Sequence, residues 1–111
     1  MSDVLIQQEG GAVRMFPQGE MTIYAAAELK EKLVAGLRQG SEIELNLAGV
    51  GEMDTAGFQL LVLLKREAVR LGKHLRLVAH SPATLEVLDR YNMASYFGDP
   101  VVLSRQGGER A

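Results

Sequence analysis

The spacing of the apolar residues changes several times along this chain, and this alternation constrains the fold more than any other feature. Short apolar or alternating runs, typical of strands, cover residues 4–8, 12–16, 43–47 and 75–79. Between the last three runs, apolar residues recur every three or four positions, as on one face of a helix. Strands joined through helices become parallel neighbours, so the sequence predicts an α/β domain.

The first two runs are joined by Gly10 and Gly11, and glycine tolerates the positive φ that a tight hairpin turn requires. The sheet is therefore expected to be mixed, with one antiparallel pair at its start. Pro17 has no N–H to donate, so we expect it to mark the end of the second strand or a bulge. A final strand is expected at residues 101–103.

The first helix is expected at residues 24–37, with Thr22 as its N-cap and Gly40 closing it as a C-cap glycine. The second helix is expected at residues 55–71 and should end at Gly72. The third helix should begin after Ser81 as its N-cap, with Pro82 in its first position. Its buried face is expected to contain residues spaced by three: Leu85, Leu88 and Tyr91.

These elements give the order β-β-α-β-α-β-α-(α)-β, in which the bracketed helix is a short turn at residues 92–96. The expected fold has a mixed sheet of about five strands with three to four helices. One domain is expected at residues 1–105, followed by a polar flexible tail at residues 106–111.

Composition excludes several classes of protein. The net charge is −2 with both signs scattered, so the chain lacks the basic stripe that nucleic-acid binding requires. No apolar run reaches about 18 residues and no signal peptide is visible, so we expect a cytoplasmic protein with no direct membrane insertion. The absence of cysteine excludes disulfides and thiolate metal sites. We expect no metal and no cofactor.

The segment at residues 46–58 carries the most specific pattern. A strand runs into a loop, and Asp54 then opens a helix, where its carboxylate can accept hydrogen bonds from the unpaired N–H groups. Thr55 follows in the first turn, near the surface. Local chemistry leaves two interpretations open: the pair only caps a helix, or Thr55 carries a phosphate that these N–H groups attract and Asp54 repels.

Catalysis is not expected. Glu20 and Asp54 are single carboxylates with nothing to pair them as acid and base, and Ser81 has no visible activating base. His74 is best explained as a solvated turn residue, and His80 as a structural residue. We therefore predict no catalytic residue and no enzyme activity.

Four short motifs occur in a fixed order: Gly19-Glu20-Met21-Thr22, Asp54-Thr55-Ala56-Gly57, Ser81-Pro82-Ala83 and Tyr96-Phe97. Together they resemble the STAS domain family, named for sulfate transporters and anti-sigma factor antagonists, which carries an Asp-Ser/Thr-small-Gly motif after its third strand. The resemblance covers residues 4–104 and implies the STAS fold.

The resemblance also implies a non-enzymatic, protein-binding switch of the anti-sigma factor antagonist type. In such antagonists a kinase that is itself the anti-sigma factor phosphorylates the residue after the Asp, which is Thr55 here. The unmodified antagonist binds the kinase and frees the sigma factor, and the phosphorylated form dissociates. Asp54, Ala56, Gly57 and Thr22 would surround the phosphosite. Two residues depart from the family pattern, since Thr22 replaces an Asp and Ala56 replaces a second hydroxyl residue.

The partner surface is expected beside the motif. A helical wheel places the core stripe of the second helix at Gly57, Leu60, Leu61, Leu64, Ala68 and Leu71. The opposite side is the predicted partner-binding face, with Phe58, Gln59, Val62 and Arg66, and Val69 also lies there. The alternative is that the third helix covers some of its apolar members.

A second function stays open. The Asp-Thr-Ala-Gly form also resembles the small cytoplasmic STAS subunit of phospholipid-transporting ABC complexes, which binds and stabilises the ATPase. Thr55 and Ala56 agree with both functions. The expected partner is thus a protein, either a serine/threonine kinase-like anti-sigma factor or a transporter ATPase, and the chain itself is expected to be a monomer or weak dimer.

Overall fold

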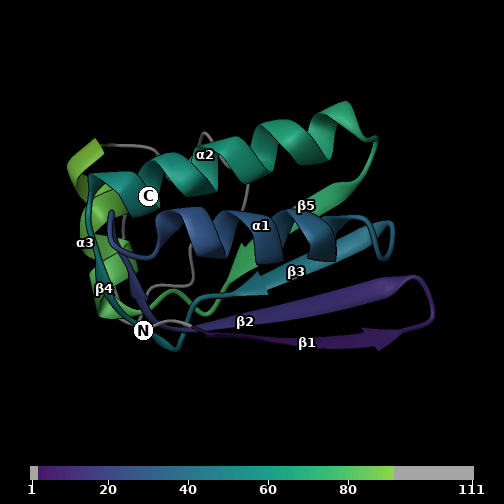
Figure 1. Cartoon of the computed structure of the whole chain (residues 1–111), viewed down its shortest axis with the longest axis horizontal. Coiled ribbons are helices and arrows are strands. Elements are labelled where there is room, and N and C mark those ends of the chain that lie inside the picture. Colours follow the sequence, from purple (N-terminus) through teal and green to yellow (C-terminus); the bar gives the residue numbers. More distant parts are fainter. Residues whose placement is uncertain (1–2, 92–111) are drawn as a thin grey trace.

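A computed structural model of the protein describes residues 3–91, and Figure 1 shows its arrangement. The strands in this range are β1 Asp3–Glu9, β2 Ala12–Met21, β3 Glu42–Asn46, β4 Val50–Met53 and β5 His74–Val78. The helices in this range are α1 Ala26–Leu37, α2 Thr55–Arg70 and α3 Pro82–Tyr91. The predicted turn at 92–96, strand at 101–103 and tail at 106–111 lie outside the described residues.

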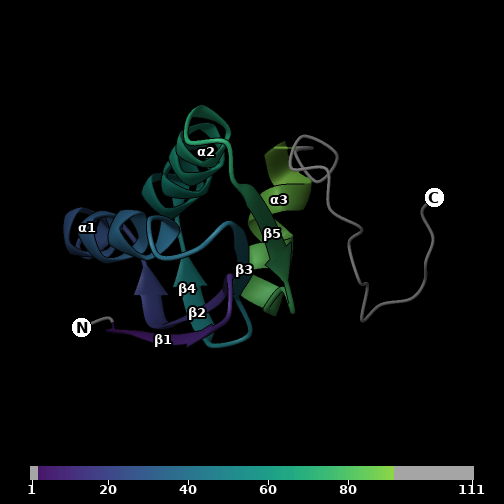
Figure 2. The same cartoon turned by 90° about the vertical axis from the view of Figure 1, so that its right-hand side faces the viewer.

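The strands form the predicted mixed sheet. Its order is β1-β2-β3-β5, and β4 pairs with β2. β1 and β2 are antiparallel, whereas the pairs β2–β3, β2–β4 and β3–β5 are parallel. Gly10 turns the hairpin with a φ of 63°, as its sequence predicted. α1 and α2 lie over one face of the sheet, and α3 packs against β4 (Figures 1 and 2).

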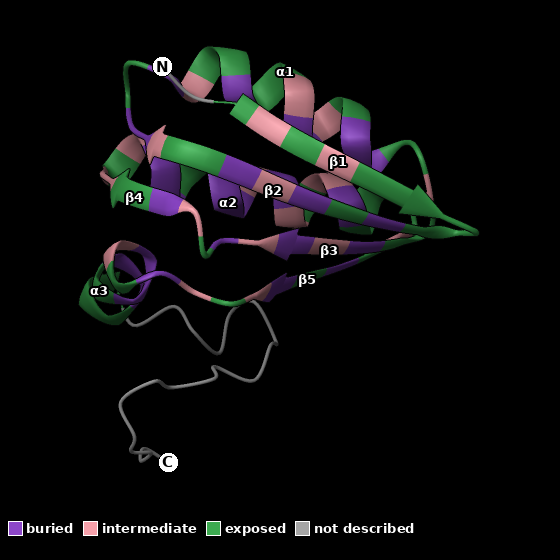
Figure 3. Cartoon of the chain, turned by 90° about the horizontal axis from the view of Figure 1, so that it is seen from below, coloured by how far each residue is buried: buried purple, intermediate pink, exposed green. Residues whose placement is uncertain are grey.

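Alternation along the strands separates the core from the open face of the sheet. Val13 and Met15 of β2, Ile43 of β3 and Leu75 of β5 are buried on the side of α1 and α2. The residues between them are mostly exposed or intermediate, as Figure 3 shows along each strand. The predicted core stripe of α2 is confirmed, since all its members are buried except Leu71, which is half-buried.

Two predictions for this sheet are wrong. β2 neither ends nor bulges at Pro17: it continues to Met21, and its register shift against β4 lies between Gly19 and Glu20. Pro17 falls between the last pair of β2 with β3 and its first pair with β4. The parallel ladder therefore has no partner at Pro17 that needs its N–H. The strand β4 was expected to be loop, because a four-residue strand containing exposed Gly51 and Glu52 shows no apolar alternation.

The start and end of α1 also differ from the prediction. The helix begins at Ala26, and its N-cap is Ala25 without a side-chain hydrogen bond, so Thr22 is not the cap. The helix ends with Arg38 as its C-cap rather than at Gly40. Gly40 is required for another reason, since a Cβ there would lie 2.5 Å from the carbonyl oxygen of Gly11.

The caps of the other two helices are as predicted. Asp54 is the N-cap of α2, and Gly72 follows that helix with a φ of 72°. Ser81 caps α3, because its hydroxyl accepts a hydrogen bond from the Thr84 N–H at 3.1 Å. Over residues 3–91, no helix has the length and apolar character that a membrane span requires.

Candidate functional site

Asp54 lies where β4 passes into α2, and its carboxylate joins two segments. One oxygen, Oδ1, accepts the N–H of Gly57 at 3.1 Å inside the first turn of α2. The other, Oδ2, accepts the N–H of Ile23 at 3.0 Å, in the loop that precedes α1. Partial burial opposes ionisation, but the backbone donors outweigh it and hold the pKa of Asp54 below its usual value. Asp54 is therefore a fixed negative charge.

Gly57 brings the start of α2 against the end of β2. A Cβ at this position would lie 2.1 Å from the carbonyl oxygen of Met21, far inside any tolerated contact. The same strand end also bonds the motif directly, because the Asp54 N–H donates to Met21 O at 3.3 Å. The glycine of the Asp-Thr-Ala-Gly motif is thus explained by packing, and it fixes where Thr55 stands.

Thr55 is exposed at the first position of α2, as predicted. Its Oγ1 lies 2.9 Å from the hydroxyl oxygen of Tyr91, and either group can be the donor. The ring of Tyr91 is stacked on Phe58, with centroids 4.5 Å apart and planes 15° from parallel. The last residue of α3 thus reaches the hydroxyl of the motif, a contact that the sequence did not reveal because 36 residues separate the two.

Thr22 is buried beside this site, and its hydroxyl donates to Glu20. Its backbone carbonyl accepts the N–H of Ala25 at 2.9 Å, which turns the chain into α1. Thr22 and Asp54 therefore lie on adjoining segments, since Asp54 binds the N–H of the next residue, Ile23. Thr22 contributes a turn and a local hydrogen bond here. Its own side chain adds no carboxylate, unlike the Asp of the family pattern.

The loop between β2 and α1 presents two large apolar side chains to solvent. Ile23 is 68% exposed and Tyr24 is 91% exposed, although the backbone N–H of Ile23 is bonded to Asp54. The helical spacing predicts Tyr24 inside the first helix, whereas that helix begins at Ala26, and neither residue was predicted as a site residue. The available signal was a pair of large apolar residues between a motif and a helix start. We call Ile23 and Tyr24 the exposed loop pair.

The predicted partner-binding face of α2 is only partly exposed. Phe58 and Val62 are 6% and 8% exposed and belong to the core cluster, so the prediction that they face outward is wrong. The alternative, that the third helix covers part of this face, is confirmed for Phe58, because Tyr91 at the end of α3 stacks on it. Gln59 and Arg66 are exposed, as predicted. Their role in partner binding remains a prediction.

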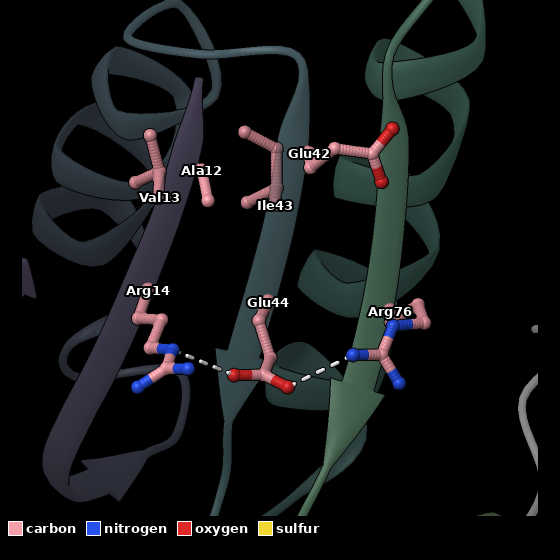
Figure 4. A pocket seen from close by; sticks show the side chains of 7 residues that line it. All are labelled: Ala12, Val13, Arg14, Glu42, Ile43, Glu44 and Arg76. Atoms are coloured by element: carbon pink, nitrogen blue, oxygen red, sulfur yellow. Dashed lines mark hydrogen bonds and ion pairs between the residues drawn. The ribbon is translucent and has the colours of Figure 1, made fainter. Parts of the chain in front are cut away.

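A second polar cluster lies on the open face of the sheet, away from the motif. Glu44 on β3 sits between Arg14 on β2 and Arg76 on β5, at 3.2 and 3.0 Å (Figure 4). The shallow pocket around them also contains Glu42, so its two arginines and two glutamates carry no net charge. We interpret the cluster as cross-strand ion pairs that support the sheet. Within residues 3–91, no group of three or more His, Asp or Glu residues could hold a metal ion.

Comparisons with known proteins identify the family and the fold of this chain. A curated relative from Bacillus subtilis (strain 168), the anti-sigma-B factor antagonist, is 28% identical over 87 residues, covering 78% of this chain and 80% of the relative. The crystal structure of an anti-sigma factor antagonist from Mycobacterium paratuberculosis has a TM-score of 0.79 at 17% identity, over 92% of this chain and 88% of that chain.

A further solved structure is the Bacillus cell fate determinant SpoIIAA in its phosphorylated form, with a TM-score of 0.65 at 17% identity, over 90% of this chain and 93% of that one. At such identities the two structures show a shared fold. A family model described as "Mlab, STAS domain" matches residues 4–103. The chain belongs to the STAS domain family.

Proposed function

We propose that this STAS domain is a non-enzymatic, protein-binding switch of the anti-sigma factor antagonist type, set by phosphorylation of Thr55. The observation that carries the proposal is an exposed hydroxyl beside a fixed carboxylate, at the position where the family motif has its Ser or Thr. The named relatives support it, since two of them are anti-sigma factor antagonists and a third was solved in a phosphorylated form.

The modification is a phosphoryl transfer from ATP, carried out by a kinase-like partner in the cytoplasm. Oγ1 of Thr55 forms a bond to the γ-phosphorus, the bond from that phosphorus to the bridging oxygen breaks, and ADP leaves. The hydroxyl proton passes to a base of the kinase. Because Thr55 Oγ1 is exposed, this reaction requires no opening of the core.

Phosphorylation changes the charge of the partner surface without changing the fold. The phosphate adds about −1.5 to −2 charges at pH 7. It stands next to Asp54, whose charge is held by two backbone donors. A partner that docks on this end of the domain with the exposed loop pair would bury apolar surface around Thr55. A phosphate there would have to lose its hydration, so the modified form dissociates.

The docking surface that we propose consists of the exposed loop pair and the exposed side of α2. Thr55, Gln59 and Arg66 share one side of that helix, because they are spaced by four and seven residues. Ile23 and Tyr24 adjoin the start of this stripe through the Asp54 contact. An apolar patch next to a hydroxyl that can be phosphorylated fits a partner that must distinguish two states of one residue.

A structural subunit of a phospholipid-transporting ABC complex is the second candidate. The Thr55 hydroxyl already has a partner in Tyr91, and a hydroxyl held in this way can serve a constitutive interface without any modification. In that case the same surface would bind a transporter ATPase. The two candidates differ in one observable, which is whether Thr55 carries a phosphate in the cell.

Peptide mass spectrometry of the chain purified from its native host tests the proposal. We expect a phosphate on Thr55, its absence from a Thr55→Ala variant and its retention in a Thr55→Ser variant, which keeps the hydroxyl. The unmodified chain should co-purify with an ATPase that releases it when ATP is added. A chain without phosphate under all growth conditions, recovered with a membrane-bound ATPase, would contradict the switch and support the transporter subunit.

A further inference from the structure

Tyr91 contacts the proposed phosphosite from a different helix. Its hydroxyl oxygen lies 2.9 Å from Thr55 Oγ1, so the two hydroxyl groups form one hydrogen bond in the unmodified chain. Tyr91 is 39% exposed, which means that solvent reaches the same place. A group attached to Oγ1 would therefore lie beside the Tyr91 hydroxyl.

The Tyr91 ring is held in position from beneath. It stacks on Phe58, which is 6% exposed and part of the core, with ring centroids 4.5 Å apart. α3 carries Tyr91 at its last position and is anchored by the buried residues Leu85 and Leu88. The phenol is thus a preorganised donor, which requires little rearrangement to meet a new acceptor.

Asp54, which precedes Thr55 in the chain, cannot donate a hydrogen bond to a phosphate. Both carboxylate oxygens of Asp54 already accept backbone N–H groups, and the carboxylate has no proton to donate. Its charge repels a phosphate, whereas the hydroxyl of Tyr91 can donate to one. A hydrogen bond from a hydroxyl to an anionic oxygen is roughly twice as strong as one between neutral groups.

From this geometry we propose that Tyr91 is the phosphate-binding residue of the modified chain and donates its hydroxyl hydrogen bond to the phosphoryl group on Thr55. The proposal rests on the proposed function, because it concerns the phosphorylated state. Tyr91 would hold the phosphate towards α3 and away from Asp54. In the unmodified chain, the same Tyr91 hydroxyl is bonded to Thr55 Oγ1 itself.

The test is a ³¹P NMR titration of chains that carry phosphothreonine at position 55, introduced by semisynthesis so that no kinase is needed. Donation from Tyr91 favours the dianion, so it lowers the second pKa of the phosphate from its usual value of about 6. The Tyr91→Phe variant keeps the stacked ring and loses only the hydroxyl. We expect its phosphate to titrate about half a unit higher than that of the wild type.

The control is Ser41→Ala, which also removes one hydroxyl group, but from an exposed residue that pairs with Gly11 at the hairpin and lies outside the proposed docking surface. Its phosphate should titrate as in the wild type. Equal titration of the wild type and Tyr91→Phe, with both folded by circular dichroism, would overturn the assignment. This outcome is separate from the proposed function, because a chain that is never phosphorylated in the cell can still show the displaced titration.

Discussion

The starts of α1 and α2 lie side by side but are stabilised differently. The start of α2 has an extended N-cap, Asp54, with a side chain that accepts the N–H of Gly57. The start of α1 has Ala25 in helical conformation as its cap, without a side-chain bond, and the preceding loop exposes Ile23 and Tyr24. The second oxygen of Asp54 reaches across to Ile23. One carboxylate therefore bonds to both the first turn of α2 and the loop before α1, and we expect a charge placed on Thr55 to act on both.

The largest effect is expected where the start of α2 is packed most closely against the end of β2. Gly57→Ala places a Cβ 2.1 Å from Met21 O, so backbone must move. We expect a loss of about 3 kcal/mol in the free energy of unfolding, measured by denaturant titration. Gly51→Ala is the control, since a Cβ there meets nothing within 4 Å. Equal stability of the two variants would show that the close approach at Gly57 is not needed.

Removing the Asp54 carboxylate breaks its hydrogen bonds to the first turn of α2 and to the loop before α1. Asp54→Ala deletes both acceptors, and we expect a loss of about 2 kcal/mol in chemical denaturation. Asp54→Asn keeps one acceptor oxygen and should lose about half as much. Equal stability of the two variants would contradict this expectation, because one of the two hydrogen bonds would then contribute nothing.

The pH dependence of stability should report the same carboxylate. The pKa of Asp54 is lower in the folded chain than its ordinary value of 3.8, so the carboxylate stabilises the fold fully above that value. This contribution is lost as the pH falls through the lower, folded-state pKa. Thermal unfolding from pH 6 to pH 2 should therefore show the advantage of the wild type over Asp54→Asn shrinking below about pH 4. A constant difference across this range would contradict the assignment.

The smallest effect is expected on the α1 side. Thr22→Val removes the hydroxyl that donates to Glu20 and keeps the shape of the buried side chain. Because Thr22 does not cap α1, we expect a loss of only about 0.5–1 kcal/mol, from one hydrogen bond. A loss as large as that of Asp54→Ala, measured under the same denaturant conditions, would mean that both helix starts depend on side-chain caps.

Local signals in the sequence predicted much of this architecture. Asp54 and Ser81 were predicted as N-caps and Gly72 as a helix end, because each position depends on the chemistry of a few neighbouring residues. The parallel strand pairs were predicted because the strands after the first hairpin alternate with helices. The same reasoning wrongly predicted Thr22 as the N-cap of α1. Its hydroxyl instead donates a hydrogen bond to Glu20, two residues earlier.

Contacts between distant segments could not be predicted in this way. The burial of Phe58 depends on Tyr91 at the end of α3, and a single-helix wheel contains no such contact. Tyr91 was expected on the buried face of its helix, yet it is partly exposed and meets Thr55. The short strand β4 forms because β2 supplies a partner, since its own residues do not alternate.

Asp54 bonds to both the first turn of α2 and the exposed loop pair, so amide hydrogen exchange at Ile23 measures whether the state of Thr55 is coupled to that loop. The Ile23 N–H donates to Asp54 Oδ2, whereas the control amide of His74 donates to Ser41 O. We predict that phosphate on Thr55 and the Asp54→Ala variant each raise the Ile23 exchange rate about threefold or more, with His74 unchanged. Unchanged exchange at Ile23 in the phosphorylated chain would contradict the coupling.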